Sequence, residues 1–187
     1  MKSIAIFASG SGSNAENIFN YFKNSSKVKV EFILTNKYDA FVIQRAKRLK
    51  IPVLIVSKSD FKDGKFLKNI FKEYTIDLIV LAGFLLLIPA YLIDLFPNKI
   101  INIHPALLPK YGGKGMYGMN VHRAVISNRE KESGITVHYV NEHYDEGEII
   151  LQESCEIFSQ DTAEDVAKKV GQLEYEFFPK AIEKVLS

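Results

Sequence analysis

Short apolar runs alternate along most of the chain with segments whose apolar residues recur every three or four positions. Such runs are typical of strands buried on both faces, and the recurring spacing is typical of amphipathic helices. Strands that alternate with helices favour parallel pairing with right-handed crossovers. We therefore expect an α/β, Rossmann-like fold with one twisted, mostly parallel sheet and helices on both faces. The predicted strands are residues 4–8, 28–34, 53–56, 78–82 and 100–103, and the predicted helices include 18–22, 40–49 and 61–74.

The last third of the chain has a different pattern. A polar turn separates the apolar segments 135–140 and 148–158, which predicts two antiparallel strands. Residues 161–186 have the spacing of a terminal helix, with Asp161 or Thr162 as its N-cap. No internal repeat, low-complexity segment or linker interrupts the chain, so we expect residues 1–187 to form a single domain with strand 4–8 at the centre of the sheet.

Composition narrows the class of protein. Of 187 residues, 47% are hydrophobic and 25% are charged, and the net charge of +2 gives no general reason to expect nucleic-acid binding. Cys155 is the single cysteine, so no disulfide can form within the chain, which fits a reducing compartment. The start of the chain lacks a signal-peptide pattern, and the longest apolar run contains Gly83 and Pro89. We expect a cytoplasmic protein that contacts neither a membrane nor nucleic acid.

A glycine-rich turn follows the first predicted strand, with the sequence ASGSGSN at residues 8–14. A turn between a buried strand and a helix presents backbone N–H groups and the positive end of the helix dipole, and glycines allow an anion to approach. The alternative is a tight turn in which Ser13 caps the helix. The pattern is neither a Walker A motif nor a full G-x-G-x-x-G fingerprint, since Ala15 occupies the third glycine position. A monophosphate is therefore favoured over a dinucleotide.

Two polar residues, Asn102 and His104, stand where the fifth predicted strand ends, in the run INIHPALLP. They are two positions apart, so in extended backbone their side chains point the same way. An amide can stabilise an oxyanion, and an imidazole can move protons near neutral pH. The alternative is a strand-terminal asparagine and a histidine that only bonds backbone around Pro105.

An acidic residue, Asp145, lies in the polar turn between the two antiparallel strands. A carboxylate beside His104 would favour the protonated imidazole and fix its tautomer. The alternative is an ordinary turn aspartate. We expect His122, on a helix, and His138, in a strand, to be structural, and His143 to be a weaker catalytic candidate than His104. No histidine or cysteine cluster has zinc-ligand spacing, so no metal is expected.

Several motifs occur in order along nearly the whole chain: SGSGSN, TNKYDAF, VLAGFLLLIP, INIHPALLPKY, GITVHYVNEHYDEGEIILQ and QLEYEFFP. Together they resemble the phosphoribosylglycinamide formyltransferase family of purine biosynthesis. The resemblance implies transfer of a formyl group from the co-substrate 10-formyltetrahydrofolate to the amine of 5-phosphoribosylglycinamide. It also implies that Asn102 binds the oxyanion, that His104 transfers protons or stabilises charge as a cation, and that Asp145 raises the pKa of His104.

The resemblance also implies binding residues and a cis Leu108–Pro109 bond. The residues matching the substrate site are Gly12, Ser13, Asn14 and Glu174. Those matching the folate site are Leu85, Leu86, Leu87, Ile88, Asn141, Glu142, His143 and Tyr144, together with Asn102 and Asp145. The loop 111–120 is longer and richer in glycine than the family resemblance leads us to expect, and is a candidate lid.

Three other functions share parts of this pattern. A 10-formyltetrahydrofolate hydrolase uses a similar core but carries an extra N-terminal domain, and methionyl-tRNA formylation requires a C-terminal RNA-binding domain; neither extra domain is expected here. A non-catalytic nucleotide-binding module would keep SGSGSN without needing Asn102, His104 and Asp145. We expect the transferase, acting as a monomer or a homodimer.

Overall fold

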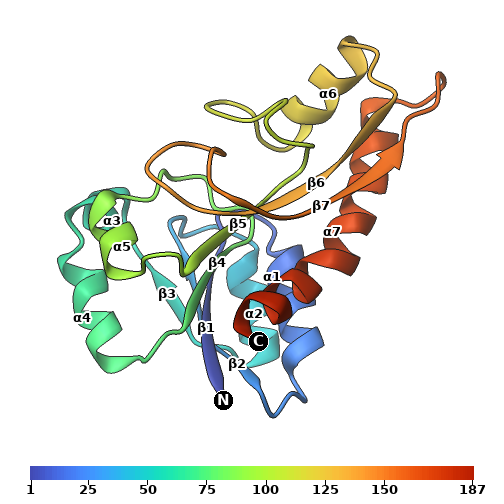
Figure 1. The fold of residues 1–187 in the computed structure, drawn as a ribbon. Helices are drawn as coiled ribbons and strands as arrows, with labels where there is room; N and C mark the ends of the chain where they lie inside the picture. Colours follow the sequence, from blue (N-terminus) through green and yellow to red (C-terminus); the bar gives the residue numbers. More distant parts are fainter. The chain divides into compact units, whose positions relative to one another are not determined.

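The computed structural model describes residues 1–187 (Figure 1). Seven strands hydrogen-bond in the order β3-β2-β1-β4-β5-β6-β7. The first four are parallel to one another, and β6 and β7 are antiparallel, so the predicted mostly parallel α/β sheet is confirmed. The chain divides into two compact units, Met1–Ile101 with Leu186–Ser187, and Asn102–Val185. The expectation of a single domain stays a prediction.

The first unit contains four parallel strands around a buried centre. Strand β1 (Lys2–Phe7) pairs with β2 (Val28–Thr35) on one side and with β4 (Leu78–Leu81) on the other, and β3 (Val53–Ile55) pairs with β2. The side chains from Ile4 to Phe7 are completely buried. The predicted central position of the first strand is therefore confirmed, and its continuous apolar run follows from burial on both faces.

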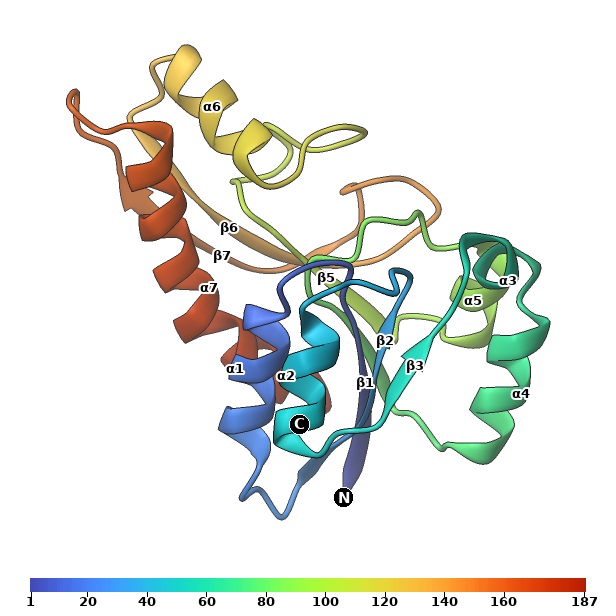
Figure 2. The same ribbon diagram turned by 180° about the vertical axis from the view of Figure 1, so that it is seen from behind.

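Helices cover both faces of these four strands (Figure 2). Helices α1 (Ser13–Phe22) and α2 (Val42–Leu49) contact each other and strand β2 on one face. Helices α3 (Lys58–Asp63), α4 (Lys65–Glu73) and α5 (Ala90–Leu95) lie on the other. There the rings of Phe7, Phe61 and Phe84 pack together, with centroids 5.1–6.3 Å apart. The short helix α5 was not among the predicted elements.

The predicted helix 61–74 is wrong as a single element, because Gly64 divides it. Gly64 has a φ of +77° and is both the C-cap of α3 and the N-cap of α4. A Cβ atom at this position would lie 2.6 Å from the ring of Tyr91. Ser57 begins α3 by accepting a hydrogen bond from the Asp60 amide. The apolar spacing continues through Gly64, so the pattern alone does not reveal the break.

The second unit contains the antiparallel pair and the terminal helix. Strand β5 (Ile100–His104) runs across the division between the two units, and helix α6 (Met119–Ser127) follows it. Strands β6 (Glu132–Tyr139) and β7 (Ile149–Glu156) are antiparallel, as predicted. Helix α7 (Ala163–Leu186) lies along β7, where Lys169 Nζ donates to the Glu156 carbonyl.

Local details of this unit also match the predictions. Thr162 Oγ1 accepts from the Asp165 amide, while the Asp165 carboxylate accepts from the Thr162 amide, so Thr162 is the N-cap of α7. The Leu108–Pro109 bond is cis, as the family resemblance implied.

No helix in the structure combines the length and the apolar composition that crossing a membrane requires.

The break at Gly64 predicts a clear difference between two glycine-to-alanine variants. Gly64→Ala should lower the free energy of unfolding by about 1–3 kcal/mol, because alanine is strained at positive φ and its methyl group meets Tyr91. Gly171→Ala is the matched control. It lies within α7 with no atom near the added methyl group, and should raise stability by about 0.5–1 kcal/mol. Urea denaturation measures both values, and equal effects would contradict the assignment.

Candidate active site

The end of strand β5 places Asn102 and His104 on one face of the strand. His104 is buried, with 3% of its surface exposed, and Asn102 is half-buried. The intervening Ile103 points to the other side and is buried as well. The extended backbone therefore brings the amide and the imidazole side by side, as the sequence predicted, at the point where Pro105 ends the strand.

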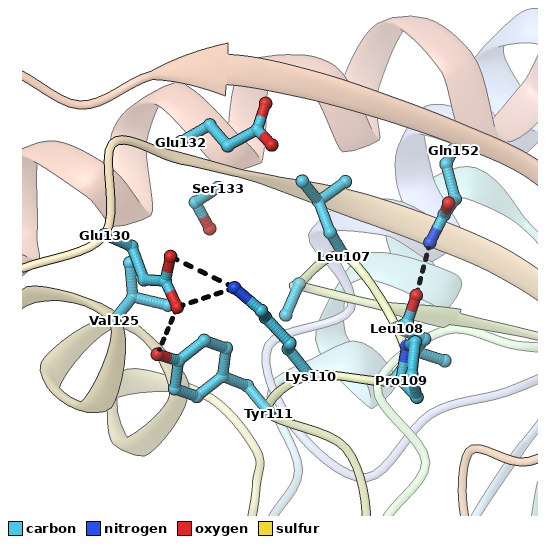
Figure 3. Close-up of a pocket in the computed structure, with 11 residues that line it drawn as sticks. Leu107, Leu108, Pro109, Lys110, Tyr111, Val125, Glu130, Glu132, Ser133 and Gln152 are labelled. Atoms are coloured by element: carbon cyan, nitrogen blue, oxygen red, sulfur yellow. Dashed lines mark hydrogen bonds and ion pairs between the residues drawn. The ribbon is translucent and has the colours of Figure 1, made fainter. Parts of the chain in front are cut away.

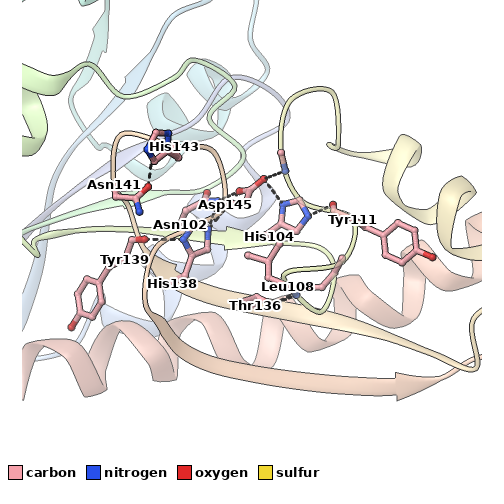
Figure 4. A network of polar contacts seen from close by, with 12 residues as sticks. Asn102, His104, Leu108, Tyr111, Thr136, His138, Tyr139, Asn141, His143 and Asp145 are labelled. Carbon is pink, nitrogen blue, oxygen red and sulfur yellow. Dashed lines mark hydrogen bonds and ion pairs between the residues drawn. The ribbon is translucent and has the colours of Figure 1, made fainter.

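His104 lies between two hydrogen-bond acceptors (Figure 4). Its Nε2 atom is 2.7 Å from the carbonyl oxygen of Tyr111, and its Nδ1 atom is 3.5 Å from Oδ2 of Asp145. Neither partner can donate a hydrogen when the carboxylate is ionised. Both ring nitrogens must therefore carry a hydrogen to satisfy the two contacts, and this arrangement favours the imidazolium form.

Burial acts against that preference. Removal from water is the largest influence on the pKa of His104 and lowers it, the Asp145 carboxylate and the Tyr111 carbonyl raise it, and the neighbouring His138 lowers it slightly. The resulting pKa lies below the ordinary value of 6.5. The sequence correctly predicts the direction of the Asp145 contribution, and burial, which the sequence pattern does not reveal, outweighs it.

Asp145 is held in place by contacts to both of its oxygens. Oδ2 accepts from the Gly113 amide at 2.8 Å, and Oδ1 accepts from Nδ2 of Asn102 at 3.4 Å. Burial tends to raise the pKa of Asp145, but the neighbouring His104 and the hydrogen bond from the Gly113 amide help to hold it below the ordinary value. Asp145 is therefore ionised at neutral pH, with a left-handed backbone conformation at φ 58°.

His138 is the site residue that sequence reasoning missed, since we expected it to be structural. Its Nδ1 donates to the Tyr139 carbonyl at 2.8 Å, which leaves Nε2 to accept from Nδ2 of Asn102 at 3.1 Å. The His138 Nε2 atom and the Asp145 oxygen both accept hydrogen bonds from Asn102. The NH2 group of the Asn102 amide, and not its oxygen, must therefore face them, which fixes the orientation of the amide. The sequence carried a signal: in the run ITVHY, Thr136 and His138 are polar at alternate positions among less polar residues.

Thr136 anchors the segment that follows His104. Its hydroxyl donates to the Ala106 carbonyl at 2.7 Å and accepts from the Leu108 amide at 3.0 Å. Gln152 donates to the Leu108 carbonyl from the adjacent strand. These contacts from strands β6 and β7 fix the backbone between Pro105 and Pro109. They thereby help to fix the position of His104.

Other predicted residues near Asp145 lie outside the polar cluster. The backbone amide of His143 donates to Asn141 Oδ1, and the side chains of Glu142, His143 and Tyr144 are exposed. His122, on α6, is buried, and its Nδ1 has no hydrogen-bond partner. Burial lowers the pKa of His122, so it is neutral at pH 7.

The glycine-rich turn lies in the first unit and leads directly into helix α1. Helix α1 begins at Ser13 with Gly12 as its N-cap at φ 75°, and no side chain makes a capping hydrogen bond there. The alternative, in which Ser13 caps the helix, is therefore wrong. Arg45 Nε donates to the Ser11 carbonyl at 2.9 Å, which places a guanidinium beside the turn. The positive end of the helix dipole favours an anion at this turn, whereas the Arg45 guanidinium is already paired with the Glu16 carboxylate in the first turn of α1.

The remaining predicted binding residues differ in exposure. Leu85 and Leu87 are 43% and 45% exposed, Leu86 is half-buried and Ile88 is buried. Glu174 is a half-buried residue of α7. No group of three or more His, Cys, Asp and Glu side chains is arranged to hold a metal ion.

Comparison with known proteins places this geometry in a family. Residues 2–182 match the family model described as formyl transferase. The chain belongs to the formyl transferase family. The chain is 40% identical over 187 residues to the chloroplastic phosphoribosylglycinamide formyltransferase of Arabidopsis thaliana, an alignment that covers 97% of this chain and 64% of that relative. The chain therefore spans less than two thirds of the length of this plant relative.

A bacterial relative and a solved structure agree with this assignment. The phosphoribosylglycinamide formyltransferase of Haemophilus influenzae is 35% identical to this formyl transferase over 97% of this chain and 86% of that protein. The crystal structure of glycinamide ribonucleotide transformylase 1 from Geobacillus kaustophilus matches with a TM-score of 0.89 at 33% identity and covers 100% of both chains. The formyltransferase fold expected from the sequence is thus confirmed.

The contacts of this formyl transferase predict how Asp145 affects His104. Asp145→Asn removes a negative charge that raises the pKa of His104, so this pKa should fall further below 6.5. Proton NMR titration of the four histidines, with His104→Asn to assign the signal, measures the shift. Glu142→Gln, which removes an exposed carboxylate from the same turn, is the matched control. An unchanged His104 titration in Asp145→Asn would contradict the pairing.

Proposed function

We propose that this formyl transferase moves the formyl group of 10-formyltetrahydrofolate to the amine of 5-phosphoribosylglycinamide, a step of purine biosynthesis. The observation that carries the proposal is the buried His104, held between the Tyr111 carbonyl and the Asp145 carboxylate beside the Asn102 amide. The names of the relatives with similar sequences point to the same reaction.

The chemistry of the cluster suits attack of an amine on a formyl carbon. Attack produces a tetrahedral species whose oxygen carries negative charge, and preorganised N–H donors stabilise such an oxygen. Asn102 Nδ2 supplies one donor. Its hydrogen bond to Asp145 is long, at 3.4 Å. The hydrogen that points to Asp145 can therefore turn to the oxyanion, while the other hydrogen of the amide stays bonded to His138.

His104 supplies positive charge when it is protonated. Its two acceptors favour the cation, and burial keeps the pKa low enough for the proton to leave. Once Nε2 turns from the Tyr111 carbonyl to the reacting atoms, the same imidazolium can stabilise the oxyanion, give its proton to the leaving folate nitrogen as the tetrahedral species collapses, and regain a proton from the attacking amine. Asp145 stays ionised through this cycle, because its pKa is held below the ordinary value, and it compensates the charge on His104.

We infer that the binding residues implied by the family resemblance act here as well. The turn at Gly12, Ser13 and Asn14 binds the substrate phosphate, supported by the start of α1, which no side chain caps, and Glu174 contacts the same substrate. The pterin of the folate contacts two segments, supported by the exposed Leu85 and Leu87 in one and the exposed side chains in the other. These segments are 85–88 and 141–145.

The oligomeric state, the cellular location and the partners of the enzyme are predicted from the sequence alone. Action as a monomer or a homodimer, a cytoplasmic location, and the lack of a metal, nucleic-acid or membrane partner all stay predictions. The name of the plant relative describes that protein as chloroplastic.

A direct assay tests the reaction. Purified protein with 10-formyltetrahydrofolate and 5-phosphoribosylglycinamide should release tetrahydrofolate only when the amine substrate is present. His104→Asn should lower kcat about 10²- to 10⁴-fold, and Asn102→Ala about 10²- to 10³-fold. Lys72→Gln, at an exposed residue of α4 that belongs to no proposed site, is the control and should retain activity. Release at the same rate without the amine would identify a 10-formyltetrahydrofolate hydrolase, and no release under any condition would contradict the proposal.

The phosphate turn is tested by a glycine whose substitution the fold tolerates. No atom lies within 4 Å of a Cβ added to Gly10, whereas one added to Gly12 would lie 2.3 Å from Val42. Gly10→Val should therefore obstruct the anion without disturbing the packing. The KM for 5-phosphoribosylglycinamide should rise about tenfold or more, since one charge-assisted hydrogen bond contributes about 1.5–3 kcal/mol. A rise confined to the KM for the folate would contradict the assignment of the turn.

A further inference from the structure

A short backbone segment contacts both charged groups of the active site. The Tyr111 carbonyl accepts from His104 Nε2 at 2.7 Å, and the Gly113 amide donates to Asp145 Oδ2 at 2.8 Å. Gly112 lies between them, and a Cβ there would be 2.7 Å from Leu108 and 3.2 Å from the Cβ of Asp145. The positions of these two peptide groups therefore govern the hydrogen bonding of the His104–Asp145 pair.

Packing alone does not hold this segment, because it borders a cavity of about 320 Å³ (Figure 3). Leu108, Pro109, Lys110 and Tyr111 form one side of the cavity, and Val125, Glu130 and Ser133 are among the residues opposite. The Ser133 hydroxyl is buried and has no hydrogen-bond partner. Polar contacts must therefore supply the restraint that a filled core would supply elsewhere.

The hydroxyl group of Tyr111 makes those contacts. It donates to Glu130 Oε1 at 2.9 Å and accepts from Asn128 Nδ2 at 2.9 Å. Asn128 is the C-cap of α6, and Glu130 follows it in the turn before β6, so both partners are fixed by secondary structure. The Tyr111 backbone has a φ of 58°, a conformation that a non-glycine residue keeps only when its surroundings hold it there.

We propose that Tyr111 is a positioning residue: the bonds of its hydroxyl to Glu130 and Asn128 hold its own carbonyl against His104 and thereby help to set the protonation of the active-site imidazole. The positioning role rests on the proposed function only where it concerns the rate of formyl transfer. The statement about His104 concerns the folded protein without substrate.

The adjacent ion pair has a different role. Lys110 Nζ lies 3.1 Å from the same Glu130 oxygen, but the lysine side chain is 68% exposed. Exposed pairs of this kind contribute little, about 0–1 kcal/mol, because water and salt screen them. The ion pair therefore adds little to the placement of the segment, and Lys110→Met should leave His104 unaffected.

The charges that face His104 do not change when Tyr111 becomes phenylalanine. They are Asp145 from the turn after β6, His138 on β6 and His122 on α6. Tyr111→Phe keeps the ring and the backbone carbonyl and removes only the hydroxyl. A change in the His104 titration in this variant therefore reports the position of the carbonyl.

The first experiment is an NMR titration of His104 in the full chain without substrate. In Tyr111→Phe the carbonyl moves from Nε2, the imidazolium loses a partner, and its pKa should fall by about 0.3–1 unit, a two- to tenfold change in protonation. Tyr117→Phe, in the same loop, and Lys110→Met are matched controls and should titrate as the wild type. Thermal melting establishes that each variant is folded.

The second experiment uses a double-mutant cycle and the formyl-transfer assay. Glu130→Ala should lower the His104 pKa in the wild-type background and change it much less in Tyr111→Phe, because both substitutions break the same bond. If the protein is the proposed transferase, the rate limb governed by His104 should shift to lower pH in Tyr111→Phe, and kcat should fall about two- to tenfold with both KM values unchanged, the range that one net hydrogen bond supports.

The outcomes separate the two proposals. An unchanged His104 titration in a folded Tyr111→Phe variant overturns the positioning role, whatever the assay shows. Additive effects of Tyr111→Phe and Glu130→Ala, or an equal shift in Lys110→Met, also overturn it. A shifted titration in a protein that has no formyl-transfer activity supports the positioning role and contradicts the proposed function.

Discussion

The active site depends on one opposition, between the burial of His104 and the two acceptors that face its ring nitrogens. Burial favours the neutral imidazole, whereas the Tyr111 carbonyl and the Asp145 carboxylate favour the cation. Neither influence alone would suit the proposed role of a group that gains and loses a proton near neutral pH. With burial the larger influence, the imidazole is neutral more readily than in water, yet it keeps two partners ready for the charged form.

The surrounding backbone serves this arrangement at close range. The turn between β6 and β7 brings Asp145 back over the end of β6, and a Cβ at Gly147 would lie only 1.6 Å from the Tyr139 carbonyl. Tyr139 also accepts from His138, which in turn orients Asn102. The three polar side chains around His104 are therefore aligned by one tightly folded turn, and a small change there would alter all of them together.

The polar cluster around His104 lies within one of the two units, whereas the residues proposed to bind ligands are distributed over both. Asn102, His104, His138 and Asp145 all belong to the unit Asn102–Val185, so the charge state of the imidazole is decided within that unit. The glycine-rich turn and the leucine segment belong to the unit Met1–Ile101.

The sequence by itself determined the alternation of strands and helices, the central first strand, the antiparallel pair and the pairing of Asn102 with His104. These features depend on the periodicity of neighbouring residues, which is a local property. The break at Gly64, the role of His138 and the lowered pKa of His104 were decided only by the tertiary structure. Each depends on groups distant in the sequence: the ring of Tyr91 at Gly64, Asn102 at His138, and the removal of water around His104. A pattern of residues records which side chains are present, whereas burial and long-range contacts decide what their chemistry becomes.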